Sequence, residues 1–149
     1  MIYKEVEQLL NSNSHEDILE QLQNEFQTLE EFASKLKDSE LDGNVITEIM
    51  QKSNGIWDGL KIVHSVVDTF KKHKELRFFH TKKMEIETSK DKVNVSALEK
   101  EASLEVANER RVRNVVEAYL AMADKNISTG QSILKKLTDS QKRVNTQES

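Results

Sequence analysis

The 149-residue sequence contains no cysteine and no proline. Without cysteine, the chain has no disulfide bonds, no thiolate zinc ligands and no cysteine nucleophile. Four glycines and an aromatic content of 5% are too few for a compact fold rich in turns and β-strands. Long helices suit this composition, because they need few turn residues and tolerate a charged content of 32%. We therefore expect an all-α protein.

Long apolar runs are missing as well. No run of about 18 apolar residues occurs that would predict a membrane helix. The amino-terminal segment MIYKEVEQLL has no basic start followed by an apolar core, so it does not resemble a secretory signal. The expectation from these patterns is a cytoplasmic protein with no membrane contact.

The motifs of common catalytic and metal sites are also absent. The sequence has no glycine-rich phosphate loop, and among the scattered histidines only His73 and His80 are spaced to share a helical face. Two histidines need a third converging ligand to hold a metal ion. No apolar pocket is evident that would adapt a carboxylate for acid–base work. We therefore expect no catalytic residue, no metal and no cofactor, and a function in binding.

Charge is distributed unevenly along the chain. Residues 1–50 hold 3 lysines against 12 acids, a net charge of −9. Residues 51–100 hold 11 basic residues against 7 acids, a net charge of +4, and the remainder is near balance with 8 against 7. Such asymmetry is typical of a chain with an interaction surface.

Apolar residues recur at helical spacings of three and four in three segments, with one irregular step near Asn126 in the third. This spacing predicts helices that pack through coiled-coil-like seams. The first stripe comprises Leu19, Leu22, Phe26, Leu29, Ala33 and Leu36. The second comprises Ile46, Ile49, Ile56, Leu60, Val63, Val67 and Phe70. The third comprises Leu98, Ala102, Val112, Val116, Tyr119, Ala123, Ile127, Leu134 and Leu137.

Local signals place the ends of these helices. Ser14 is in position to cap a helix over residues 15–37, and Ser96 with Glu99 has the spacing of a capping box for the third stripe. Segment 84–95 fits either a helix ending near residue 88 or a short β-hairpin. Gly55 and Gly59 lie one turn apart within the second stripe, where they weaken the helix or let another backbone approach closely.

Together these patterns predict a long antiparallel helical hairpin with an N-terminal helix packed on it. We divide the chain into an acidic N-terminal helical segment (1–44), the hairpin (45–138) with a basic stretch at 71–83 and a turn at 88–96, and a flexible tail (139–149). An extended hairpin has little interior, so we also expect its seams to face a second copy in a homo-oligomer. The expected interface residues are Leu22, Phe26, Leu29, Ile56, Leu60, Val63 and Val67.

The basic stretch is the strongest functional signal. Six cations oppose a single acid, Glu75, and the aromatic pair Phe78 and Phe79 lies among them. Cations neutralise phosphates and exposed rings stack on unpaired bases, so this combination favours single-stranded DNA as the partner. The predicted contacts are Lys71, Lys72, Lys74, Arg77, Phe78, Phe79, Lys82 and Lys83. In the alternative interpretation, the two phenylalanines are core residues and the lysines only solvate a helix.

Residues 57–137 resemble the phage recombination mediators of the UvsY type. The resemblance lies in the lysine-rich segment FKKHKELRFFHTKKMEIE, a polar turn, and a helix that opens with Leu98-Glu99-Lys100-Glu101 and continues to Leu137. It implies a ring-like oligomer, in a phage-infected cell, that binds single-stranded DNA and helps load a recombinase onto DNA covered by single-strand binding protein. The acidic residues 1–50 have no counterpart in that pattern.

A second class of function is compatible with the same helices. Helical seams also occur in structural and adaptor proteins, such as scaffolds, chaperones and inhibitors, that bind other proteins. This alternative predicts that the phenylalanines are buried and that charge reversal in the basic stretch leaves function intact.

Overall fold

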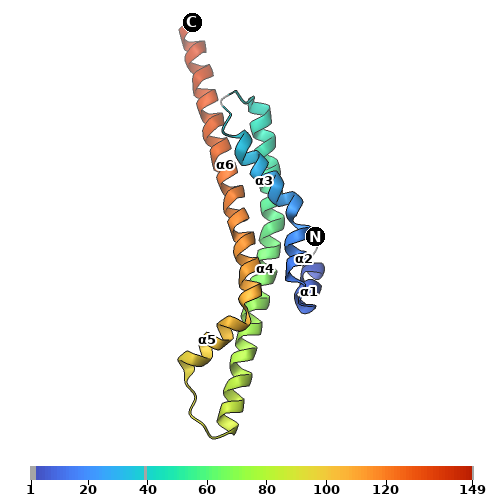
Figure 1. Cartoon of the computed structure of the whole chain (residues 1–149). Coiled ribbons are helices and arrows are strands. Elements are labelled where there is room, and N and C mark those ends of the chain that lie inside the picture. Colours follow the sequence, from blue (N-terminus) through green and yellow to red (C-terminus); the bar gives the residue numbers. More distant parts are fainter. Residues whose placement is uncertain (1–2, 39, 149) are drawn as a thin grey trace. The chain divides into compact units, whose positions relative to one another are not determined.

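The computed structural model describes residues 3–38 and 40–148, and the regular elements in this part of the chain are all helices. They are α1 (Tyr3–Asn11), α2 (His15–Gln21), α3 (Gln23–Lys35), α4 (Gly43–Thr88), α5 (Val95–Glu105) and α6 (Ala107–Glu148), shown in Figure 1. The all-α expectation is confirmed. None of the described helices combines the length and the apolarity needed to cross a membrane.

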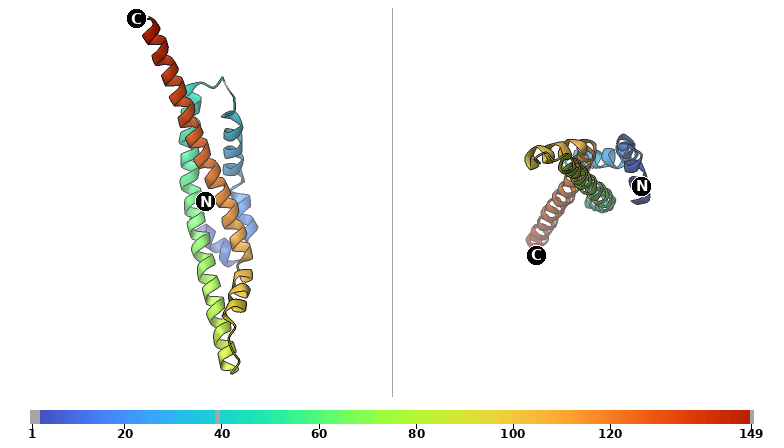
Figure 2. Two further views of the ribbon diagram at one scale, coloured as in Figure 1. Left: turned by 90° about the vertical axis from the view of Figure 1, so that its left-hand side faces the viewer. Right: turned by 90° about the horizontal axis from the view of Figure 1, so that it is seen from below.

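The helices form two compact units, which we describe separately. Unit 1 contains α1, α2 and residues 62–116, and unit 2 contains α3, the first part of α4 up to Lys61, and α6 from Glu117 onward. The long helices α4 and α6 therefore contribute to both units. Two further views of the same helices are given in Figure 2.

Unit 2 is built from three helical segments. Phe32 and Leu36 pack with Ile46 and Ile49 of α4 in one buried cluster, which Ile133 of α6 helps to cover. The ring of Phe26 stacks on Tyr119, with centroids 3.9 Å apart and an interplanar angle of 9°. The buried amide of Asn126 donates to the Leu29 carbonyl at 3.1 Å. The N-terminal helix therefore packs on the hairpin, as the stripes predict.

Unit 1 joins α1 and α2 to the second part of α4, to α5 and to the start of α6. Its core side chains come from every one of these segments. The buried apolar residues are Val6, Leu10, Ile18, Leu19, Val63, Val66, Val67, Leu98, Ala102, Val106, Val112 and Val116. Burial of this apolar surface is the main favourable contribution to folding of the unit.

Several helix ends differ from the sequence-based expectation. The helix expected over residues 15–37 is divided at Leu22 into α2 and α3, and the returning helix is broken at Val106 between α5 and α6. α4 continues to Thr88, so the β-hairpin alternative for segment 84–95 is wrong. Segment 139–149, expected to be a flexible tail, is helical as far as Glu148.

Of the two predicted N-caps, the one at Ser96 is wrong, and Ser14 directly precedes α2 as expected. Helix α5 begins after Asn94, whose side chain accepts a hydrogen bond from the Ala97 amide at 3.1 Å, so the Ser96 capping box does not form. Ser14 precedes α2, but its hydroxyl lies 3.1 Å from that of Ser12. At α5, Asn94 therefore takes the capping role that was expected of Ser96.

Candidate nucleic-acid interface

The whole basic stretch lies on the last turns of α4, within unit 1. No glycine or proline occurs between Leu60 and Thr88, and lysine, arginine, glutamate and leucine favour helix. The helical period therefore distributes the cations around α4 instead of placing them on one face. Their environments differ, and we consider them in turn.

Four of the six cations have carboxylate partners in the folded chain. The linear sequence shows one acid in this stretch, but folding and helix periodicity bring three more, which corrects the charge balance expected from the sequence. The pairs are Lys71 with Glu75 at 3.3 Å, Lys72 with Asp68 at 2.9 Å, Lys74 with Glu109 at 2.6 Å, and Lys82 with Glu85 at 3.4 Å.

Lys74 belongs to a buried charge cluster. Its partner Glu109 is fully buried, and His15 of α2 places its Nε2 3.1 Å from the same carboxylate oxygen, Oε1, without the alignment of a hydrogen bond. Burial raises the pKa of Glu109, but the hydrogen bond from Lys74 and the nearby positive charges outweigh it and leave that pKa below its ordinary value. Lys74 therefore pairs with Glu109 inside unit 1, and its role as a DNA contact stays a prediction.

Lys71 is also mostly withdrawn from solvent, since only 11% of its side chain is exposed. Lys82 is 44% exposed and lies 5.8 Å from the centroid of the Phe78 ring. Lys83 is half-buried. These three side chains therefore lie beside the most solvent-exposed face of α4 and not in the middle of that face.

The outer face of α4 carries what we call the cationic strip: Lys72, His73, Leu76, Arg77 and His80. All five residues are exposed, and no exposed acid lies between Thr69 and Met84 in this described part of α4. Asp68 borders the strip. The hydrogen bond from Lys72 lowers the pKa of Asp68, and the Arg113 guanidinium, 3.3 Å away, lowers it further, although burial acts in the opposite direction.

The strip includes residues that the sequence analysis did not assign to the site. The sequence places His73 and His80 on either side of the aromatic pair, but the predicted DNA contacts do not include them. Their place on the strip follows from the helical period, in which residues three, four and seven apart share a face. Among the described residues, no three His, Asp or Glu side chains are arranged to hold a metal ion.

Phe78 and Phe79 are both half-buried. They are therefore neither the fully exposed rings that DNA binding would favour nor the fully buried core residues of the alternative interpretation. Phe79 meets the ring of His80 edge-on at 5.6 Å. It also lines an apolar groove of roughly 440 Å³ between α4 and α5. The groove residues are Lys72, Glu75, Leu76, Phe79, Glu99 and Ala102. The groove therefore opens beside the cationic strip, and Lys72 and Leu76 belong to both.

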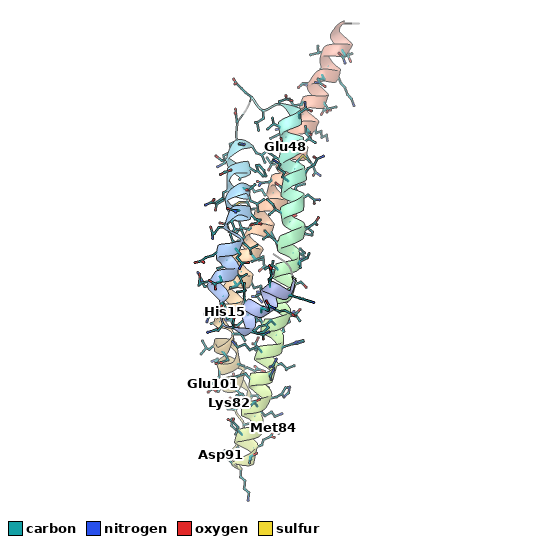
Figure 3. All side chains as sticks on the ribbon, turned by 90° about the vertical axis from the view of Figure 1, so that its right-hand side faces the viewer. His15, Glu48, Lys82, Met84, Asp91 and Glu101 are labelled. Atoms are coloured by element: carbon teal, nitrogen blue, oxygen red, sulfur yellow. The ribbon has the colours of Figure 1, made fainter. Side chains whose placement is uncertain are left out.

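Large apolar side chains are exposed near this end of unit 1. Leu76 is 56% exposed, Met84 67% and Leu104 of α5 73%. Figure 3 labels Lys82 and Met84 on α4 and Glu101 on α5. Exposed apolar side chains beside a groove are a feature of interaction surfaces.

The residues expected at an interface between copies lie largely inside the single chain. Leu22, Phe26, Leu29, Leu60, Val63 and Val67 are buried, and Ile56 is half-buried. Trp57, next to Ile56, is half-buried with the Lys61 ammonium 5.8 Å from its ring. The seam thus packs within the chain, and its role between copies stays a prediction.

The chain shows no significant match to any protein-family model, curated protein or solved structure. The geometry of the strip and groove is therefore the basis for the function proposed next.

Proposed function

We propose that this chain is a non-enzymatic binding protein that holds single-stranded nucleic acid on the cationic strip of α4. The observation that carries the proposal is the exposed face from Thr69 to Met84, which presents Lys72, Arg77 and two histidines without an exposed acid. A face of this kind attracts phosphates through charge. The half-buried ring of Phe79 lies beside it as a surface on which a base can stack.

The strip is short, which limits the affinity of one copy. From Lys72 to His80 it extends about 12 Å along the helix at 1.5 Å per residue. A single chain therefore contacts only a few phosphates, and its affinity falls steeply with salt. Several copies acting together bind far more tightly through effective concentration. This is the arrangement implied by the resemblance to UvsY-type mediators, and recombinase loading is the specific role that we propose on that basis.

Fluorescence anisotropy with a labelled single-stranded oligonucleotide tests the proposal. We expect Lys72→Glu with Arg77→Glu to reduce affinity about tenfold or more and to flatten the dependence on salt. The matched control is Lys52→Glu with Lys61→Glu, which makes the same change in net charge on exposed positions of α4 outside the strip. Absence of binding at low salt, or an equal loss in both double variants, contradicts the proposal.

A gain of affinity provides a second test that a misfolded variant cannot imitate. Asp68 holds both Lys72 and Arg113. Asp68→Asn removes the bordering negative charge and releases the two cations, so we expect oligonucleotide affinity to rise a few-fold at low salt. A lower or unchanged affinity in this variant opposes the strip as the binding surface.

A protein partner is the second candidate, favoured by the apolar groove between α4 and α5. The partner that fits it is an amphipathic helix whose apolar face covers Leu76, Phe79 and Ala102. Binding of this kind is insensitive to salt and is lost in Leu76→Gln. Nucleic-acid binding, in contrast, keeps its salt dependence in that variant, so the two readouts separate the candidates.

A further inference from the structure

The groove between α4 and α5 lies entirely within unit 1 and combines apolar and acidic walls. Its residues on α4 are spaced i, i+3, i+4 and i+7, so they share one face of that helix, and its two residues on α5 are one turn apart. Figure 1 shows α5, in yellow, diverging from α4 towards the start of α5. Ala102 is buried, and Glu99, one turn nearer to that start, is exposed. Ala102 therefore lies at the bottom of the groove and Glu99 at its rim.

Lys72 belongs both to the groove and to the cationic strip, which indicates what the groove could hold. A nucleotide carries its base and its phosphate on the same sugar, so a surface that binds both needs a cation next to a hollow for the base. Lys72 meets this requirement, since its side chain is 69% exposed. The groove volume of roughly 440 Å³ lies within the range of small-ligand pockets, about 300 to 1,000 Å³. One nucleobase fits it, with Leu76 and Phe79 as apolar contacts.

The two glutamates of the groove differ in their partners. Glu75 Oε2 lies 3.3 Å from the ammonium of Lys71. Glu99, in contrast, makes no ion pair and no side-chain hydrogen bond with any residue that the structure describes. Both oxygens of the Glu99 carboxylate are therefore available to a ligand in the groove.

A carboxylate at this position discriminates between the bases, because it accepts hydrogen bonds and donates none. The Watson–Crick edge of guanine presents two adjacent donors, N1–H and N2–H, which match the two oxygens of one carboxylate. Adenine and cytosine present one amino donor beside a ring-nitrogen acceptor. Thymine and uracil present one donor between two carbonyl oxygens, which the negative charge repels. Unpaired bases are read through these edges, and hydrogen bonds to a charged acceptor are the strong ones. Guanine is therefore the base that Glu99 favours most.

We propose that the groove is a base-binding subsite that selects guanine in a single strand. The ring of Phe79 stacks on the base, the Glu99 carboxylate accepts hydrogen bonds from its Watson–Crick edge, and Lys72 contacts the phosphate of the same nucleotide. This inference rests on the proposed binding of single-stranded nucleic acid and adds a preference among bases to it. The acidic rim and the cationic strip then act on different parts of one nucleotide.

Fluorescence anisotropy with oligothymidylates that differ only in the central base tests the selection. One central guanine should raise affinity about fivefold or more over thymine, and adenine or cytosine should give a smaller gain. Hypoxanthine offers a similar ring for stacking but lacks the N2 amino group, so it should lose most of the gain of guanine. Equal affinity for all of these oligonucleotides overturns the selection and leaves the proposed function intact. Absence of any binding at low salt overturns both.

The Glu99→Gln variant tests the assignment of the carboxylate. The preference for guanine should fall to about twofold or less, while affinity for plain oligothymidylate stays the same or rises slightly because a negative charge is removed. The matched control is Glu101→Gln, which removes an exposed acid of the same helix, labelled in Figure 3, that does not line the groove. The control should keep the full preference. An equal preference in the two variants overturns the role of Glu99.

The Phe79→Leu variant separates stacking from hydrogen bonding. Leucine keeps an apolar side chain at this half-buried position, and circular dichroism verifies that the helix content is retained. Loss of the ring should weaken binding of every oligonucleotide in the set several-fold and leave the ratio of guanine to thymine unchanged. Unchanged affinity in this variant would mean that no base enters the groove, and it would overturn the proposal. The same outcome is expected if the groove holds a partner helix instead.

Discussion

Lys74 of α4 and Glu109 of α6 form an ion pair in which only the lysine reaches solvent. The lysine Nζ lies 2.6 Å from Glu109 Oε1; the lysine side chain is 35% exposed and that of the glutamate is fully buried. The glutamate also keeps its second oxygen, Oε2, without a hydrogen-bond partner among the described residues. Loss of Lys74 would leave a buried carboxylate with much weaker compensation.

We therefore predict that Lys74→Met destabilises the protein strongly. The expected loss is about 3 kcal/mol of unfolding free energy at neutral pH, because one partner of a buried pair is removed. Chemical denaturation followed by circular dichroism measures it. Lys52→Met, which breaks an exposed pair with Glu48 on the same helix, serves as the control and should leave the transition midpoint unchanged.

The cost of Lys74→Met should fall in acid. A carboxyl group whose pKa is lower in the folded chain than its ordinary value, here 4.5, stabilises the fold at pH values above that ordinary pKa. This stabilisation is lost as the pH falls through the folded-state pKa. The difference between wild type and variant is thus predicted to be larger at about pH 7 than at about pH 3. An equal difference at both pH values would mean that Lys74 contributes packing alone.

A second prediction concerns Tyr119 in unit 2. Its hydroxyl donates to Glu30 Oε1 at 2.6 Å, and this bond, with burial and the carboxylate charge, raises the pKa of Tyr119. Glu30→Gln should therefore shift formation of the phenolate to lower pH. Ultraviolet titration in a Tyr3→Phe background isolates Tyr119, the other of the two tyrosines. Glu31→Gln changes the neighbouring exposed acid and should have no such effect.

A third prediction distinguishes the two possible caps of α5. Asn94→Ala removes the side-chain acceptor of the Ala97 amide, and we expect it to cost about 1 kcal/mol of stability. Ser96→Ala is the comparison, because Ser96 is exposed and lies within the first turn of α5. Thermal unfolding should give a lower melting temperature for Asn94→Ala than for Ser96→Ala. The reverse order would support the Ser96 capping box instead.

The glycines give a fourth prediction. A Cβ added at Gly55 or Gly59 meets nothing within 4 Å, so alanine there should stabilise α4 by about 1 kcal/mol at each site. A Cβ at Gly130 would lie 2.5 Å from Met50 Cγ and 3.4 Å from Ile46 Cγ2. Gly130→Ala should therefore fail to give this gain in denaturant unfolding. Destabilisation by Gly55→Ala would instead indicate a close contact with a second molecule.

The sequence predicts the helices well because their apolar periodicity is strong. Most residues of the stripes around Phe26, Val63 and Val116 become core, since a heptad-like spacing specifies which face is buried whatever the partner. The third stripe also contains Leu137, which is exposed. The helix breaks at Leu22 and Val106 carry no glycine or proline signal, so they could not be seen in advance. Tertiary packing decides them.

The site was less predictable than the fold. The pattern identifies the basic stretch, but it does not show that Glu109, 35 residues beyond Lys74, would take that lysine. Long-range ion pairs depend on tertiary structure, which local spacing does not contain. The exposed face of α4, in contrast, could have been derived by placing His73, Arg77 and His80 on a helical wheel.

The connectivity of the two units has a consequence for synthesis on the ribosome. The chain moves from one unit to the other at residues 21–22, 61–62 and 116–117. Unit 1 therefore cannot close its core before the beginning of α6 has been made, and unit 2 cannot close its core before α6 extends as far as Leu134. Until then the stripe of α4 remains partly uncovered in the nascent chain, with only helices from the N-terminal segment to pack on it. No single cut in the gene separates one intact unit from the other.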